Sequence, residues 1–201
     1  MKQGATKAMS GLQLVPDRSA FANQWLRSAQ KQQDTGQVFS AYFSAYLALV
    51  VCATQVMGDT KSIPIGEDEN WEKDAIEKAM NFKHKEIAIF LESENGVRIK
   101  QAIWQREIPE NKNIHIIGPG NDLVLQQAAI NLAAYFRPLR TSPLNPSEKI
   151  NQAQDLATLF RKVRNRLFHG GKMNDPEGSD AELLNKLNPL LIAIVEILQQ
   201  H

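Results

Sequence analysis

The sequence predicts an all-α protein, a helical bundle, and three observations lead to this fold class. Apolar residues recur at helical spacing along most of the 201-residue chain. Residues that start and end helices bracket these stretches. Hydrophobic residues make up 43% and charged residues 22% of the chain, ordinary values for a protein that buries a core. We therefore expect one helical domain over residues 16–201, preceded by a flexible N-terminus over residues 1–15.

The first two predicted helices lie before residue 58. Phe21, Trp25 and Leu26 recur at helical spacing and predict a helix that begins just after residue 17. An uncharged run over residues 37–57, flanked by glycines, predicts the second helix. This run is rich in Ala, Ser, Tyr and Thr rather than Leu and Ile. We therefore expect a central buried helix and no membrane span.

Residues 59–121 form a long middle region with an acidic run near its start, which consists of Glu67, Asp68, Glu69, Glu72, Asp74 and Glu77. Apolar positions between residues 70 and 104 predict one or two helices, interrupted at Asn95-Gly96. The β-branched run at residues 114–117 predicts a strand-like connector. The whole region is interpreted as a possible insertion: a helical hairpin, a partner-binding surface or a steric cover over a site. Its acidic run is typical of a solvated face.

Two further helices are predicted near the C-terminus. Residues 122–136 form one, which ends before Pro138. The other begins at a capping box, Ser179 to Glu182, is rich in Leu and Ile, and is expected to kink at Pro189.

Between these two lies the longest predicted helix. Asn145 is its predicted N-cap, with Pro146 at the first helical position and Glu148 at the third. Gly170-Gly171 is predicted to end it. Its core-facing stripe consists of Leu156, Leu159, Phe160, Val163 and Leu167.

Composition excludes some kinds of site and compartment. Cys52 is the single cysteine, so an intramolecular disulfide and a cysteine-based zinc site are excluded. A reducing compartment, the cytoplasm, is expected, and the first residues lack a signal-peptide core. The net charge of +1 gives no overall attraction to nucleic acid or membranes. However, eight basic residues lie between residues 137 and 172, opposed only by Glu148 and Asp155. Such a local patch can hold phosphates.

The end of the longest helix carries the candidate site. Arg161, Asn165 and His169 follow one another at four-residue spacing and form a line away from the apolar stripe. Arg164 sits beside that line. Gly170-Gly171 allows the last turn to unwind, so that the imidazole of His169 can turn toward Arg164.

These residue types suit cleavage of RNA by its own 2′-hydroxyl. Histidine titrates in the range needed to take the hydroxyl proton, which suits His169. The guanidinium of Arg164 offers a fixed fork of donors to the negative charge that develops at phosphorus. Asn165 would orient the imidazole or bind a phosphate oxygen. We expect no metal or cofactor, because the nucleophile belongs to the substrate, and we expect DNA to resist.

The same residues also allow a simpler interpretation. His169 would then be a favourable charge near a helix C-terminus, and the arginines would form a solvated face. An Arg followed five residues later by a His occurs by chance in many helical proteins. The spacing alone therefore leaves both interpretations open.

The stretch FRKVRNRLFHGGK, residues 160–172, resembles the signature of the HEPN superfamily (higher eukaryotes and prokaryotes nucleotide-binding domain). That signature has an Arg, a polar residue that is often Asn, three variable residues and a His near a helix end. Here Arg164, Asn165 and His169 match it. The resemblance covers about a dozen residues; the rest of the chain agrees only in architecture.

The resemblance implies an up-and-down helical core that dimerises, so that two copies of the motif form one composite site. It implies a metal-independent endoribonuclease, with Arg164 and His169 catalytic and Asn165 supporting. We expect Arg161, Arg166 and Lys172 to bind the RNA substrate. The family further suggests a toxin or anti-phage defence effector, with an antitoxin or defence-system partner. The alternative is a non-catalytic module that binds a nucleotide, RNA or a partner protein.

Other candidate residues are interpreted as structural. His84 is expected to be exposed, and His115 to be a packing residue. Cys52 is expected to be a small buried hydrophobe. The Gly118-Pro119-Gly120 turn lacks the Gly-Lys-Ser/Thr ending of a phosphate loop and is interpreted as a turn before a capped helix.

Overall fold

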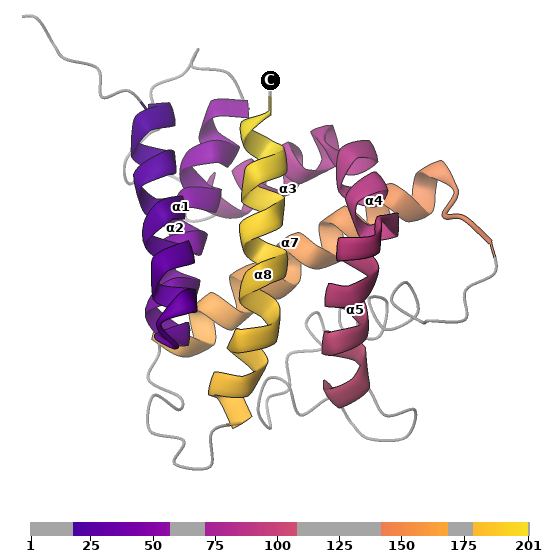
Figure 1. Ribbon diagram of the computed structural model, residues 1–201. Helices are drawn as coiled ribbons and strands as arrows, with labels where there is room; N and C mark the ends of the chain where they lie inside the picture. Colours follow the sequence, from indigo (N-terminus) through magenta and orange to yellow (C-terminus); the bar gives the residue numbers. More distant parts are fainter. Residues whose placement is uncertain (1–17, 57–70, 108–141, 169–178, 201) are drawn as a thin grey trace, which may run out of the picture.

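The computed structural model of the chain describes residues 18–56, 71–107, 142–168 and 179–200, which form seven α-helices and no strand (Figure 1). The predicted all-α class is therefore confirmed for this part of the chain. The strand-like connector at 114–117, His115 and the predicted helix at 122–136 lie outside the described residues. The helices are α1 (Arg18–Asp34), α2 (Val38–Val56), α3 (Trp71–Phe82), α4 (His84–Glu92), α5 (Glu94–Glu107), α7 (Pro146–Phe168) and α8 (Ser179–Gln199).

The turn between α1 and α2 shows how local chemistry fixes the first corner. Gly36 has a φ of +75°, the left-handed conformation that L side chains rarely adopt. The Gln37 N–H donates to the Gln32 carbonyl at 2.8 Å, and the Gly36 N–H donates to the Gln33 carbonyl at 3.1 Å. This pair of hydrogen bonds is a Schellman motif, which ends α1 and lets the chain reverse into α2.

Helix α2 is the central helix that the uncharged run predicts. It packs against α1, α8 and α3, and ten of its side chains between Val38 and Ala53 are buried. Among the described helices, α2 alone is long and apolar enough to cross a membrane by length and composition. Because 56% of its apolar window is buried inside the fold, its place is that of a core helix.

The region from residue 71 to residue 107 differs from the prediction. It contains three helices rather than one or two, and Asn95-Gly96 lies in the first turn of α5 instead of interrupting a helix. The break falls at Ser93, whose hydroxyl donates to the Phe90 carbonyl at 2.6 Å and accepts from the Gly96 N–H at 3.2 Å. Ser93 thus closes α4 and caps α5.

Helix α7 begins as predicted. The Asn145 side chain accepts from the Glu148 N–H at 2.9 Å, and Glu148 accepts from the Asn145 N–H at 2.8 Å. This reciprocal capping box confirms Asn145 as the N-cap. The predicted apolar stripe is buried throughout: Leu156, Leu159, Phe160, Val163 and Leu167. Helix α7 packs mainly against α3 and α4, and it crosses obliquely behind α8 (Figure 1).

Helix α8 contains Pro189, whose ring removes the N–H that would bond to the Asn185 carbonyl four residues earlier. Gln33 of α1 supplies a replacement, since its Nε2 lies 3.3 Å from that carbonyl and 2.6 Å from Asn185 Oδ1. Gln33 Oε1 accepts from the buried Asn188 at 2.7 Å. An amide network therefore joins α1 to α8 around the proline.

Candidate functional site

The described part of the predicted site lies on the last turns of α7. Arg161, Lys162, Arg164 and Asn165 are all half-buried, so water reaches this face only in part. His169, Gly170-Gly171 and Lys172 lie outside the described residues, as does the side chain of Arg166. The structure therefore bears on Arg161, Arg164 and Asn165 of the predicted site residues.

Arg164 is held by three neighbours from three helices. Its Nη2 lies 2.9 Å from Oε2 of Glu72 on α3, and its Nη1 donates to Oδ1 of Asn165 at 2.8 Å. Its guanidinium also lies over the ring of Tyr46 on α2, 5.6 Å from the ring centroid. The predicted neighbours Arg164 and Asn165 thus interact directly, with Asn165 acting on the guanidinium.

Two tyrosines of α2 form the floor beneath this arginine. Tyr42 and Tyr46, one turn apart, stack with ring centroids 6.3 Å apart. The Tyr42 hydroxyl donates to the Phe160 carbonyl of α7 at 2.5 Å, and the Tyr46 hydroxyl donates to Oε1 of Glu72 at 2.6 Å. Both hydroxyls of these buried aromatic rings therefore have a hydrogen-bond partner, one on α7 and one on α3.

Burial and charge keep the two phenols protonated. Burial raises the pKa of Tyr42 well above its ordinary value. Burial and the hydrogen bond to Glu72 likewise raise the pKa of Tyr46, while the guanidinium groups of Arg164 and Arg161 oppose the shift. Tyr46 is therefore a hydrogen-bond donor to Glu72 across the neutral pH range.

Arg161 lies one turn before Arg164 on the same helix face. Its charge acts on Tyr46, which places it at the same cluster. Its Nε atom is buried without a hydrogen-bond partner in the described part of the chain. Two guanidinium groups, those of Arg161 and Arg164, thus act on Tyr46 together with the Glu72 carboxylate, and guanidinium groups are the side chains best suited to bind an anion.

Glu72 corrects the interpretation of the acidic run as a solvated face. Its side chain is only 20% exposed because it reaches from α3 to Arg164. Asp74 in the same run is exposed, as expected. Sequence reasoning missed Glu72 and Tyr46 as members of the site. For Tyr46 an indication existed, since a buried tyrosine hydroxyl needs a partner. For Glu72 the sequence offered none beyond its charge.

Of the other candidate residues, His84 and Cys52 lie in the described part of the chain, and the Gly118-Pro119-Gly120 turn lies outside it. His84 is half-buried rather than exposed, and its Nδ1 lies 2.7 Å from the Asn81 carbonyl. Cys52 is buried as predicted, and burial raises the pKa of its thiol to about 12. The described residues contain no cluster of three His, Cys, Asp or Glu side chains that could hold a metal ion.

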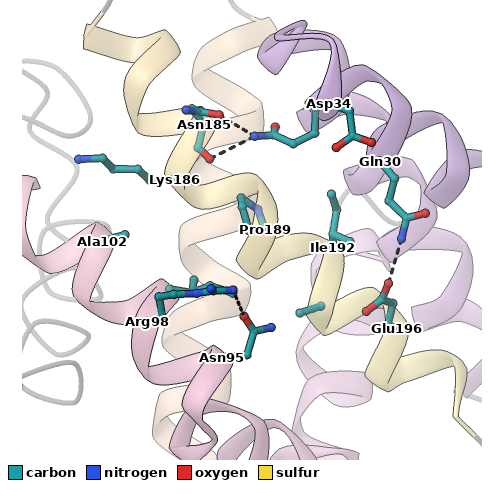
Figure 2. A pocket seen from close by; sticks show the side chains of 13 residues that line it. Gln30, Asp34, Asn95, Arg98, Ala102, Asn185, Lys186, Pro189, Ile192 and Glu196 are labelled. Atoms are coloured by element: carbon teal, nitrogen blue, oxygen red, sulfur yellow. Dashed lines mark hydrogen bonds between the residues drawn. The ribbon is translucent and has the colours of Figure 1, made fainter.

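Away from Arg164, a pocket with a volume of about 660 Å³ lies between α1, α5 and α8 (Figure 2). Amide side chains and charges of both signs surround an apolar floor that includes Pro189 and Ile192. Along its α1–α8 edge, Gln33 donates hydrogen bonds to Asn185. Gln30 donates one to Glu196, which Figure 2 shows. Of the predicted site residues that the structure describes, Arg161, Arg164 and Asn165, none lines it, and its mixed charges favour no one class of ligand.

The arrangement around Arg164 can bind and orient an anion. A guanidinium fixed in its plane presents donors in a defined direction, which suits a phosphate group. Comparison with protein-family models, with curated proteins and with solved structures finds no match for this chain. The chemistry of the site therefore carries the functional argument.

Proposed function

We propose that the protein is an endoribonuclease that cleaves RNA by attack of a ribose 2′-hydroxyl on the adjacent phosphate. The observation that carries this proposal is the fixed, half-buried guanidinium of Arg164, five residues before His169 at the end of α7. The second guanidinium, Arg161, adds positive charge at the same place. The resemblance of residues 160–172 to the HEPN signature, with its up-and-down helical core, supports the same function.

In the proposed reaction the 2′-oxygen forms a bond to phosphorus and the bond to the 5′-oxygen breaks. His169 takes the proton of the 2′-hydroxyl, and the 5′-oxygen leaves with a proton from a protonated imidazole. Arg164 stabilises the negative charge of the transition state. The products are a 2′,3′-cyclic phosphate and a 5′-hydroxyl, and this chemistry requires no metal.

A homodimer would provide both imidazoles. In the proposed assembly, Arg164 and His169 of two copies face one composite site, where one histidine is the base and the other the acid. Mixing wild-type protomers with an excess of His169→Ala protomers tests this assembly. A mixed dimer keeps one histidine and lacks either the base or the acid, so the variant is expected to suppress the activity of the wild-type protomers it pairs with. Activity that stays proportional to the amount of wild-type protomer would contradict the composite site.

The activity itself is tested with purified protein and single-stranded RNA in excess EDTA. Cleavage is expected to persist under chelation and to stop at a linkage that carries a 2′-deoxy sugar. We expect His169→Ala to lower kcat about 10²- to 10⁴-fold. Arg164→Ala should lower it about 10²- to 10³-fold. Arg27→Ala is the matched control, because Arg27 is an exposed arginine of α1; it should cleave like the wild type.

The second candidate, a non-catalytic module, predicts a different result from the same material. The cluster of Arg161 and Arg164 would bind RNA, a nucleotide or an acidic partner surface without turnover. Binding of RNA that Arg164→Ala weakens, with intact RNA recovered, would identify this function. If cleavage occurs, we propose further that it serves as a toxin or defence activity in the cytoplasm, restrained by an antitoxin-like partner.

A further inference from the structure

Glu72 links Arg164 to the core of the protein. One carboxylate oxygen, Oε2, accepts from Arg164 Nη2 at 2.9 Å, and the other, Oε1, accepts from the Tyr46 hydroxyl at 2.6 Å. Tyr46, on α2, is 2% exposed and belongs to the hydrophobic core. The position of the carboxylate is therefore set by a buried phenol, and the carboxylate in turn sets one end of the guanidinium.

The contacts fix the orientation of the guanidinium as well as its position. A planar group held at both Nη atoms, by Glu72 and by Asn165, cannot rotate about its Nε–Cζ bond without breaking a hydrogen bond. The ring of Tyr46 beneath it restricts tilting of the plane. A long arginine side chain otherwise has many rotamers, so this cluster organises the group before a substrate arrives.

Glu72 is one of three charged groups that act on Tyr46. The other two are the guanidinium groups of Arg161 and Arg164. Among the described residues, this pairing of two guanidinium groups with one carboxylate favours an anion over a cation. The hydrogen bond from Tyr46 also distinguishes Glu72 from a carboxylate that merely occupies the place of a substrate, because it ties Glu72 to the core.

We propose that Glu72 and Tyr46 are positioning residues that hold the Arg164 guanidinium in the orientation needed to bind the scissile phosphate. This inference rests on the proposed ribonuclease function for the identity of the anion, and on the described contacts for the positioning itself. It gives the middle region, through α3, a direct part in the site.

Kinetics of two conservative variants test the proposal. Glu72→Gln keeps the shape but removes the charge, and Tyr46→Phe keeps the ring but removes the donor. A misplaced Arg164 should lower kcat about 10²-fold in Glu72→Gln, with a smaller change in KM. The Tyr46 hydroxyl acts through Glu72 and the ring is kept in Tyr46→Phe, so the double variant should be no slower than Glu72→Gln alone. The control is Glu86→Gln, a carboxylate of α4 that pairs with Lys83 at 3.9 Å.

A nuclear magnetic resonance measurement separates this inference from the proposed function. In ¹⁵N-edited spectra at low temperature, a guanidinium held at both ends gives separate Nη signals, whereas a rotating one gives an average. Separate Arg164 signals, assigned by their loss in Arg164→Lys, are expected in the wild type and should merge in Glu72→Gln and Tyr46→Phe. This readout needs no RNA, so a protein that cleaves nothing still tests the positioning.

Two outcomes would overturn the proposal. If Glu72→Gln raises kcat, or tightens binding of a 2′-O-methyl oligoribonucleotide that the enzyme cannot cleave, Glu72 competes with the substrate instead of positioning Arg164. If the Arg164 signals are averaged in the wild type, or are unchanged in both variants, the guanidinium is not held by these contacts. Thermal unfolding of each variant shows whether a loss of activity reflects a loss of fold.

Discussion

The Tyr42 hydroxyl donates a hydrogen bond of 2.5 Å to the backbone carbonyl of Phe160, one helical turn before Arg164. This bond joins α2 to α7 inside the core, since both residues are fully buried. It therefore sets the distance between the helix that carries Arg164 and the helix that carries Tyr46.

Tyr42→Phe tests the energetic contribution of this bond. The ring stays in the core and only the hydroxyl is lost, so we expect the free energy of unfolding to fall by about 1 kcal/mol. The Phe160 carbonyl keeps its helical partner, so a larger loss is not expected. Urea unfolding measures the change. Tyr46→Phe, which also removes one buried hydroxyl, is the comparison variant. A fall in the free energy of unfolding above about 3 kcal/mol for Tyr42→Phe would mean that packing, not the hydrogen bond, is disturbed.

Arg161→Ala is expected to weaken RNA binding more than it slows cleavage. Arg161 adds charge beside Arg164, but no described contact fixes its guanidinium as those of Arg164 do. The loss of one phosphate contact should weaken binding of a 2′-O-methyl oligoribonucleotide about tenfold and reduce the salt dependence of binding by about one phosphate. Titrations at several salt concentrations measure both. A kcat loss as large as that of Arg164→Ala would assign Arg161 a catalytic role instead.

The sequence predicted those parts of the fold and site that depend on local chemistry. Asn145 and Glu148 bond to each other within one turn, so their capping box can be recognised from four residues. Arg164 and Asn165 were predicted as neighbouring site residues, but Asn165 was expected to act on the imidazole or a phosphate oxygen, and its hydrogen bond to the guanidinium was not predicted. The buried stripe of α7 follows from its period alone.

The parts that were missed depend on how distant helices pack. Glu72 reaches Arg164 across 92 residues of sequence, and only the packing of α3 on α7 brings them together. The break at Ser93 was placed two residues late, because Asn95-Gly96 suggests a turn while a serine hydroxyl can cap a new helix. A close approach of α5 to α4 explains why a glycine stands at position 96.

Gly96→Ala is expected to destabilise this corner strongly. A Cβ at this position would lie 2.0 Å from the Phe90 carbonyl oxygen and 2.7 Å from the Cα atom of Leu91. Both neighbours are backbone atoms, so α4 and α5 must move apart at a cost of about 1–3 kcal/mol. Gly36→Ala is the comparison. Its Cβ meets no atom within 4 Å, but its φ is +75°, so strain alone should cost about 1–2 kcal/mol.

The two glycine variants should also differ in how far from the substituted residue the structure is disturbed. Gly96→Ala displaces the α4–α5 corner, so hydrogen exchange should increase at amides of α4 and α5. Gly36→Ala strains only the α1–α2 turn and should leave those amides unchanged. Both variants are measured by urea unfolding and hydrogen exchange. Equal exchange of the α4 amides in both would contradict the close approach at Gly96.

Gln33 and Pro189 are expected to be energetically coupled. Gln33→Leu leaves the Asn185 carbonyl without the donor that replaces the missing proline N–H, and should cost about 1–3 kcal/mol. Pro189→Ala restores an N–H at this position in α8. The loss caused by Gln33→Leu should therefore be smaller in a Pro189→Ala background. Unfolding of the four proteins gives the coupling energy, and strictly additive losses would show that the amide network does not compensate for the proline.

Stability should decline above pH 9, because buried acids keep their protons only in the folded state. Burial raises the pKa of Cys52 from 9.0 to about 12, and it raises those of Tyr42 and Tyr46 above 10.0. A raised pKa means that the folded state binds the proton more tightly. The stabilisation is therefore complete below the unfolded pKa and is lost as the pH rises toward the folded one.

Cys52 contributes first, between pH 9 and about 12, and the tyrosines follow above pH 10. Each group should lower the free energy of unfolding by about 1.4 kcal/mol per pH unit within its window. Urea unfolding at pH 8 and pH 10 measures the decline in the free energy of unfolding. The Cys52→Ala variant isolates the contribution of the thiol, because the decline of this variant over the same range should be smaller by about 1.4 kcal/mol. The same decline in both proteins would show that the Cys52 thiol titrates alike in the folded and unfolded chains.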